Sequence, residues 1–266
     1  MPAKTALCSR WMIWSARMAA LDNHCYELGL NSPWMNAAGF GGYLPQHNND
    51  LSIPMGAFVT NPISLLPRSP SLTRSVLSYP GGFMLHSGSP NPGMKIVLKT
   101  YAKKWSNLPV PLWVHLLVTT PYEVQTMIRL LEETQSVSAV ELSLPPDAST
   151  KSQFELVASA LGELPFFVCV PVDRAEPAFI EKIASLGADG VVISAPRGMM
   201  MQGGKCRQGR LYGPSLHPQM MAALHRLRGL NLPLIAGCGI FSKAHGEAAL
   251  EIGAAAVQVD AWTWKF

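Results

Sequence analysis

Residues 185–194, SLGADGVVIS, and residues 251–259, EIGAAAVQV, decide the fold of this chain. In each stretch an apolar helical pattern ends at a glycine, and a short run of apolar residues follows directly. Glycine is the usual residue just past the end of a helix, and a short apolar run is typical of a strand that is buried on both faces. Each stretch therefore predicts a helix that leads into a strand of a parallel sheet.

The same alternation runs along most of the chain and predicts eight buried strands. We expect these strands at residues 34–37, 57–60, 113–118, 139–144, 166–172, 190–195, 233–238 and 255–260. Helical patterns are clearest at residues 121–134, 152–161, 177–186, 218–227 and 243–250. Eight strands that alternate with helices within 266 residues predict an α/β protein, a single (β/α)₈ TIM barrel.

Two long stretches without a clear pattern interrupt this alternation. Residues 66–93 are rich in proline, glycine and serine, and residues 197–218 carry five glycines. Each follows a predicted strand, and long loops at the carboxyl ends of barrel strands are where such folds place their functional sites. We interpret residues 199–201, a run of methionines beside two glycines, as part of a mobile loop or lid.

The two termini raise a question about how the barrel is completed. The chain stops at Phe266, so no room remains for an eighth helix after the last strand. Residues 1–21 show apolar side chains at helical spacing, and we expect an amphipathic helix that fills the eighth-helix position, with residues 22–266 forming the barrel. Two other interpretations stay open, upstream sequence with translation starting at Met18, and a membrane-surface or targeting helix. A partner subunit covering the same seam, or a truncated or frame-shifted gene, would also explain the missing helix.

Composition excludes several classes of protein. Hydrophobic residues make up 48% of the chain and charged residues 14%, so a large core is expected and disorder is not. The net charge of +4 is scattered, which argues against a nucleic-acid partner. Five cysteines without a CxxC pair predict neither a disulfide framework nor a zinc or iron–sulfur site, and no stretch near the N-terminus is long enough to cross a membrane. We expect a cytoplasmic protein that forms a homo- or hetero-oligomer.

Six segments, taken in order, resemble the FMN-dependent dihydroorotate dehydrogenases. They are LNSPWMNAAGF (30–40), GAFVTNPISLLPRSP (56–70), RSVLSYPGGFMLHSGSPNPG (74–93), AVELSLPP (139–146), GRLYGPSLHP (209–218) and the pair LPLIAGCGI (232–240) and GAAAVQVDA (253–261). The resemblance implies an FMN-binding barrel that oxidises a CH–CH bond of a small substrate in pyrimidine biosynthesis. It also implies, by matching positions, the residues that surround flavin and substrate.

The positions that match the family's flavin contacts are Ala37, Ala38, Gly39, Thr60, Asn61, Cys169, Ser194, Gly213, Gly239, Asp260 and Ala261, and those near the substrate are Asn91 and Ser143. Several polar residues of the family are replaced. Asn61 and Cys169 stand where the family has lysines, and a lysine at the second position would stabilise an anionic reduced flavin. Leu144 stands at the position of the catalytic base and cannot accept a proton. We therefore assign no residue of this chain a catalytic role on the basis of the resemblance.

The phosphate end is altered as well. The resemblance places the flavin phosphate against backbone N–H groups after the last two strands, where Gly239 is kept but Cys238 and Asp260 replace small neutral residues. A carboxylate about 5 Å from a phosphate costs a few kcal/mol at an effective dielectric near 20. Tyr212 replaces a serine, and its ring either wedges into the pocket or stacks on the flavin.

Three functions remain open at this point. One is an FMN oxidoreductase of this family with a changed substrate. Another is a barrel without flavin that acts as a structural or regulatory partner, as the substitutions at Asn61, Leu144 and Cys169 favour. The third is a barrel that binds a phosphate ligand through the last two strand loops, against which Asp260 argues.

Overall fold

The computed structural model describes residues 28–45, 54–72 and 75–260, and it confirms the barrel and its eight predicted strands. The barrel strands are β1 (Trp34–Asn36), β2 (Phe58–Val59), β5 (Leu112–Leu117), β6 (Ala139–Ser143), β7 (Phe166–Pro171), β8 (Gly190–Ser194), β11 (Leu234–Gly237) and β12 (Ala256–Val259). All of them run parallel, in the order β1-β12-β11-β8-β7-β6-β5-β2. The amphipathic helix predicted at residues 1–21 and the end of the chain from residue 261 lie outside the described residues.

The first and last strands of this order meet at a seam that closes the barrel. A parallel bridge joins Met35 to Ala57, and the Gly56 N–H donates to the Trp34 carbonyl. The side chain of Asn36 adds two bonds to Val59, accepting from its N–H at 2.8 Å and donating to its carbonyl at 2.6 Å. The short strand β2 is therefore held by a side chain as well as by the sheet.

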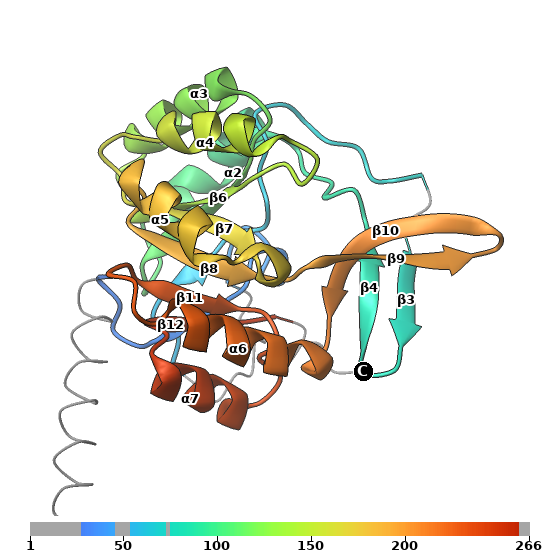
Figure 1. Cartoon of the computed structure of the whole chain (residues 1–266). Coiled ribbons are helices and arrows are strands. Elements are labelled where there is room, and N and C mark those ends of the chain that lie inside the picture. Colours follow the sequence, from blue (N-terminus) through green and yellow to red (C-terminus); the bar gives the residue numbers. More distant parts are fainter. Residues whose placement is uncertain (1–27, 46–53, 73–74, 261–266) are drawn as a thin grey trace, which may run out of the picture.

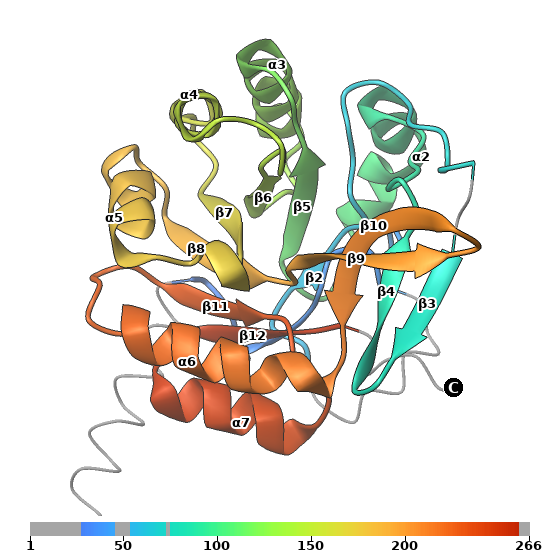
Figure 2. The same cartoon turned by 45° about the vertical axis from the view of Figure 1, so that its right-hand side comes forward.

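Helices cover the outside of the barrel (Figures 1 and 2). They are α2 (Met94–Trp105), α3 (Pro121–Glu132), α4 (Thr150–Ala158), α5 (Pro177–Ser185), α6 (His217–Leu227) and α7 (Lys243–Ile252). Helix α3 begins with a full capping box between Thr120 and Glu123, which satisfies N–H groups that the first turn leaves open. Among the described residues, no helix has the length and hydrophobicity that a membrane span requires.

A second sheet stands beside the barrel, and the sequence did not predict it. It consists of four antiparallel strands in the order β3-β4-β10-β9, with β3 at Ser75–Tyr79, β4 at Gly82–His86, β9 at Arg197–Gln202 and β10 at Lys205–Tyr212. The methionine run that we interpreted as a mobile loop or lid is strand β9, so that interpretation is wrong in its secondary structure. Figure 2 shows this sheet rising next to the barrel from the two long excursions.

The barrel interior is filled by alternate side chains of the strands. Met35, Val59, Trp113, Phe167 and Ile235 belong to one buried cluster, and the rings of Trp113 and Phe167 stack at 4.3 Å. A larger cluster lies between the strands and the helices outside them. Two apolar layers thus hold the barrel rigid, and the carboxyl ends of the strands are left to form a site.

Candidate functional site

Two adjoining pockets open at the carboxyl ends of the barrel strands. The first, of about 230 Å³, is lined by residues that end β5, β6, β7 and β8, among them Leu117, Ser143 and Ser194. The second, of about 370 Å³, lies between the loop after β1 and the strands β4 and β10. Four residues line both pockets: Arg68, Ser89, Arg197 and Arg210. The pockets are therefore two parts of one site, joined at the arginines.

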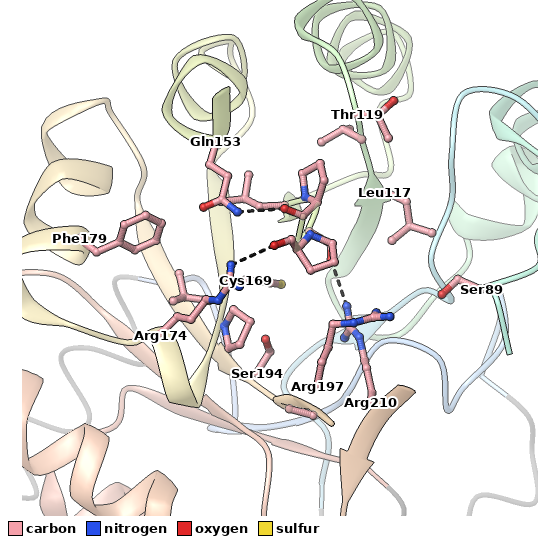
Figure 3. Close-up of a pocket in the computed structure, with 18 of the residues that line it drawn as sticks. Ser89, Leu117, Thr119, Gln153, Cys169, Arg174, Phe179, Ser194, Arg197 and Arg210 are labelled. Atoms are coloured by element: carbon pink, nitrogen blue, oxygen red, sulfur yellow. Dashed lines mark hydrogen bonds between the residues drawn. The ribbon is translucent and has the colours of Figure 1, made fainter. Parts of the chain in front are cut away.

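Positive charge dominates this site. Arg174 lines the first pocket in addition to the three shared arginines, and neither lining contains an aspartate or a glutamate. Figure 3 shows Arg174 on one side of the first pocket and Arg197 and Arg210 on the other. Guanidinium groups stay charged at every physiological pH, so this opening attracts anions.

Hydrogen bonds hold two of these arginines in place. Arg210 donates from Nη2 to the Ser143 hydroxyl at 3.1 Å, and Arg174 donates to the Pro146 carbonyl at 3.1 Å. Both partners are neutral, so the guanidinium charges are positioned without being cancelled. Arg210 and Arg197 face each other across the β9–β10 pairing, which places two like charges side by side. An anion between them would remove that repulsion.

A buried polar layer lies below the first pocket, inside the barrel. His115 on β5 contacts Glu141 on β6 through Nδ1 and Oε2 at 2.8 Å. The other Glu141 oxygen accepts a hydrogen bond from Gln258 on β12. The sulfur of Cys169 lies 4.0 Å from both the His115 nitrogen and the Glu141 oxygen. Burial, and then the Glu141 charge, raise the pKa of the Cys169 thiol, while Arg210 acts in the opposite direction.

The predicted site residues fall into separate groups. Ser143, Leu144, Cys169 and Ser194 line the first pocket. Ala38, Gly39 and Asn61 line the second. Neither lining includes the remaining described positions, which are Ala37, Thr60, Asn91, Gly213, Gly239 and Asp260, and Ala261 lies outside the described residues.

Some of these residues have structural partners. Asn91 is buried, and its side-chain oxygen accepts from the N–H groups of Ser64 and Gly93. The Thr60 hydroxyl accepts from the His115 N–H, and the Asn61 side chain accepts from Gly42. The Asn91 side chain is thus engaged within its own loop region, and Asn61 ties the loop after β1 to the end of β2 while it lines the second pocket.

At the phosphate end of the resemblance, protein backbone packs against one side of Gly239. A Cβ placed on Gly239 would lie 2.7 Å from the backbone nitrogen of His217, so this glycine accommodates a neighbouring chain segment. Cys238 and Asp260 are fully buried. Burial and then the Asp260 charge raise the pKa of the Cys238 thiol, which keeps this sulfur neutral.

Tyr212 is buried near Asp260 and lines the second pocket. Its ring stacks on Phe83 with centroids 5.4 Å apart and meets Phe40 edge-on at 5.4 Å. A Cβ on the following Gly213 would lie 2.2 Å from the Gly81 carbonyl oxygen, so the β3–β4 turn packs directly on this segment. Of the two roles considered for Tyr212, the structure favours the wedge, since the ring already packs between protein aromatic rings.

The four arginines are the site residues that sequence reasoning missed. They come from the loop after β2, the 3-10 helix Val172–Arg174, and strands β9 and β10, so no local pattern groups them. One signal was available for Arg210. It occupies the second position of GRLYGP, where the family motif has a glycine, and such a change adds both a long side chain and a charge.

Comparison with known proteins agrees with the resemblance, although no protein-family profile matches the sequence. The catalytic subunit of dihydroorotate dehydrogenase B (NAD(+)) from Pelobacter propionicus is 25% identical over 87% of this chain and 84% of its own length. The putative dihydroorotate dehydrogenase A (fumarate) from Pediococcus pentosaceus is 26% identical over 91% of this chain and 88% of its own length.

A solved structure supports the fold. A FabK mutant from Thermotoga maritima superposes with a TM-score of 0.51 at 15% identity, over 90% of this chain. The chain spans 64% of the length of that protein, and at this identity the likeness shows the fold alone.

Proposed function

This chain is a divergent relative of the dihydroorotate dehydrogenases, and we propose that it binds a small anionic molecule at the barrel mouth. Unlike the FMN-dependent family that it resembles, it does so without FMN. The observation that carries the proposal is the set of four arginines around two joined pockets whose linings contain no carboxylate. In this account the chain keeps the barrel of its relatives and has exchanged the flavin site for an anion site.

The residues at the phosphate end do not fit FMN. Backbone of the β11 loop packs on the start of α6 at Gly239, and Asp260 brings a buried carboxylate to the place where a phosphate would need positive potential. Tyr212 occupies the space above, between Phe83 and Phe40. Neither lysine position of the resemblance carries a cation, because Asn61 and Cys169 stand there.

The arginine site suits an anion with planar oxygen groups. A guanidinium presents parallel N–H donors that match a carboxylate or phosphate with two hydrogen bonds. Ser143 and Ser194 add hydroxyl groups to the first pocket. At an effective dielectric of 20, one charge pair at 4 Å contributes about 4 kcal/mol before desolvation is subtracted. Leu144 offers no proton acceptor, so binding is better supported than proton transfer at that position.

Calorimetric titration of the purified chain with orotate and with inorganic phosphate tests this function. We expect saturable binding of at least one of these anions that weakens as salt rises. Arg210→Gln removes one charged hydrogen-bonding partner and should weaken binding about 10- to 100-fold, since such bonds contribute about 1.5–3 kcal/mol. Arg129→Gln is the matched control, because Arg129 is exposed on α3 and lines neither pocket.

Equal anion affinity in the Arg210→Gln and Arg129→Gln variants would rule out the arginine site. Absence of binding by the wild-type chain at millimolar anion and low salt would do the same.

The second candidate is an FMN-dependent oxidoreductase of pyrimidine biosynthesis. Similarity to dihydroorotate dehydrogenases over 87–91% of the chain favours it. So does the second pocket, which Ala38, Gly39 and Asn61 line together. In this candidate Arg210 takes over the positive charge that the lysine positions have lost. The two candidates differ most sharply in flavin content.

A further inference from the structure

Three potential metal ligands meet in the buried layer below the first pocket. His115, Glu141 and Cys169 come from the neighbouring strands β5, β6 and β7, and they are 2%, 1% and 5% exposed. One ligand atom of each lies within 4.8 Å of the other two. Imidazole, carboxylate and thiolate together form the mixed donor set that zinc and similar transition metals bind, and the Cys169 thiol would release its proton to solvent as the metal binds.

The charge balance of this layer favours a cation. Glu141 is buried, and among the described residues no lysine or arginine forms a salt bridge with it. Its partners are His115 and the neutral amide of Gln258. The other ring nitrogen of His115, Nε2, is buried and has no hydrogen-bond partner in the described part of the chain, so the ring makes its polar contact toward the cluster. An ionised carboxylate in such surroundings is costly unless a positive charge compensates it.

We propose that His115, Glu141 and Cys169 bind one divalent transition-metal ion of the zinc class. The Nδ1–Oε2 distance is 2.8 Å, and both atoms lie 4.0 Å from the sulfur. An ion in the plane of these atoms, about 2.0 Å from the nitrogen and oxygen, would lie about 2.3 Å from the sulfur, and these are ordinary zinc bond lengths. Tetrahedral coordination would require Nδ1 and Oε2 to move about half an ångström apart and the sulfur to come about half an ångström closer to both, which places the ion outside this plane.

The fourth coordination position would face the first pocket. Cys169 is the member of the cluster that lines this pocket, together with Ser143 and Arg210. Three protein ligands with one open position are typical of metal sites that bind an exogenous molecule. An anion held by the arginines would therefore lie close to the metal ion. The pocket would then present positive charge from the ion beside Cys169 as well as from the arginines around its opening.

The sequence offered no sign of this site because its ligands are far apart along the chain. His115, Glu141 and Cys169 lie one on each of three strands, separated by 26 and 28 residues. Metal motifs are recognised by short spacing within one element. Only the parallel register, which pairs His115 with Glu141 and Ser143 with Cys169, brings these three side chains together.

Cobalt(II) titration of the purified, chelator-treated chain tests the proposal, because a cobalt–thiolate bond gives an intense near-ultraviolet charge-transfer band. We expect one equivalent to produce this band and added zinc(II) to abolish it. Cys169→Ser should remove the band and weaken cobalt binding by about 100-fold or more, since loss of an outer partner alone commonly costs 10- to 100-fold. Cys206→Ser and Cys238→Ser, at the other described cysteines, should leave the band unchanged.

Two results would overturn the metal site. One is a wild-type chain that shows no cobalt–thiolate band at stoichiometric metal, a result that needs no variant to fold. The other is a band that persists in Cys169→Ser. Neither readout depends on anion binding or flavin, so failure of the metal site is distinguishable from failure of the proposed function.

Discussion

Arg210 shows how one side chain changes the chemistry of the barrel mouth. It occupies a glycine position of the family motif, reaches Ser143 on another strand, and opposes Arg197 in the adjacent strand. The resemblance implied the loss of a lysine at Asn61, of the catalytic base at Leu144 and of a second lysine at Cys169. It did not identify this gain, because a new charge has meaning only once the strands around it are placed.

His217 gives a residue-level prediction about pH. Its ring stacks on His245 at 4.1 Å, and burial, followed by the His245 charge, lowers the His217 pKa below its ordinary value of 6.5. The unfolded chain therefore takes up this proton at a higher pH than the folded chain does. The contribution of His217 to the free energy of unfolding is complete above pH 6.5. This contribution is lost as the pH falls from 6.5 through the lower pKa that His217 has in the folded chain. The melting temperature of His217→Gln should consequently fall less than that of wild type between pH 7 and pH 5.

The control for this prediction is His225→Gln, which changes an exposed histidine on the same helix. It should keep the wild-type pH dependence. Parallel melting curves for wild type and His217→Gln across this pH range would contradict the assignment.

At the level of elements, the two long excursions were harder to predict than the barrel. Strands β4 and β10 pair although more than 120 residues of sequence separate the partners. Arg210, Leu211 and Tyr212 lie opposite Leu85, Met84 and Phe83. Local patterns cannot detect such pairing, and the prolines and glycines around both hairpins read as loops. The barrel strands were predictable since apolar residues predominate in each of them, even where a single polar residue such as His115 or Glu141 interrupts the run.

Helix α7 supplies an element-level prediction at its contact with β1. A Cβ on Gly246 would lie 2.1 Å from the ring of Trp34. The helix can therefore pack this close to the strand only because Gly246 has no side chain. Alanine normally stabilises a helix by about 1 kcal/mol over glycine. Here we expect Gly246→Ala to destabilise the protein, because overpacking costs about 1–3 kcal/mol. Urea unfolding measures the change in free energy.

A smaller partner should relieve this clash. In a Trp34→Leu background the cost of Gly246→Ala should shrink or reverse, a coupling that a double-mutant cycle detects. Equal costs in both backgrounds would mean that the ring and the helix do not meet as described.

On the scale of the whole molecule, the barrel depends on the seam between β1 and β2. Asn36→Leu would leave the buried N–H and carbonyl of Val59 without their side-chain partner. Each of the two lost partners costs about 1–3 kcal/mol, so we expect a loss of about 2–6 kcal/mol in the free energy of unfolding. Asn231→Leu, in an exposed loop, should change it by no more than about 0.5 kcal/mol. Similar values for the two variants in chemical denaturation would contradict this role of Asn36.

The sequence predicted the strands and helices of the barrel better than it predicted what covers the seam between the first and last strands. Strand number, order and the position of the mouth all follow from apolar runs and from parallel connections. The amphipathic helix at residues 1–21 and its place at the seam remain predictions, as does the oligomer, since both concern residues or partners outside the described structure. The site residues remain predictions: seven of the described positions line the two pockets at the strand ends, and six line neither.

The visible absorption spectrum of the purified chain, recorded before and after equilibration with excess FMN and gel filtration, distinguishes an anion-binding barrel from a flavoprotein. We predict a colourless protein that retains no flavin, because Asp260 is a buried carboxylate at the phosphate end, protein atoms pack against Gly239, and neither lysine position of the resemblance carries a cation. A flavin spectrum near one equivalent per chain, before or after this treatment, would contradict the claim and make the FMN oxidoreductase the better account.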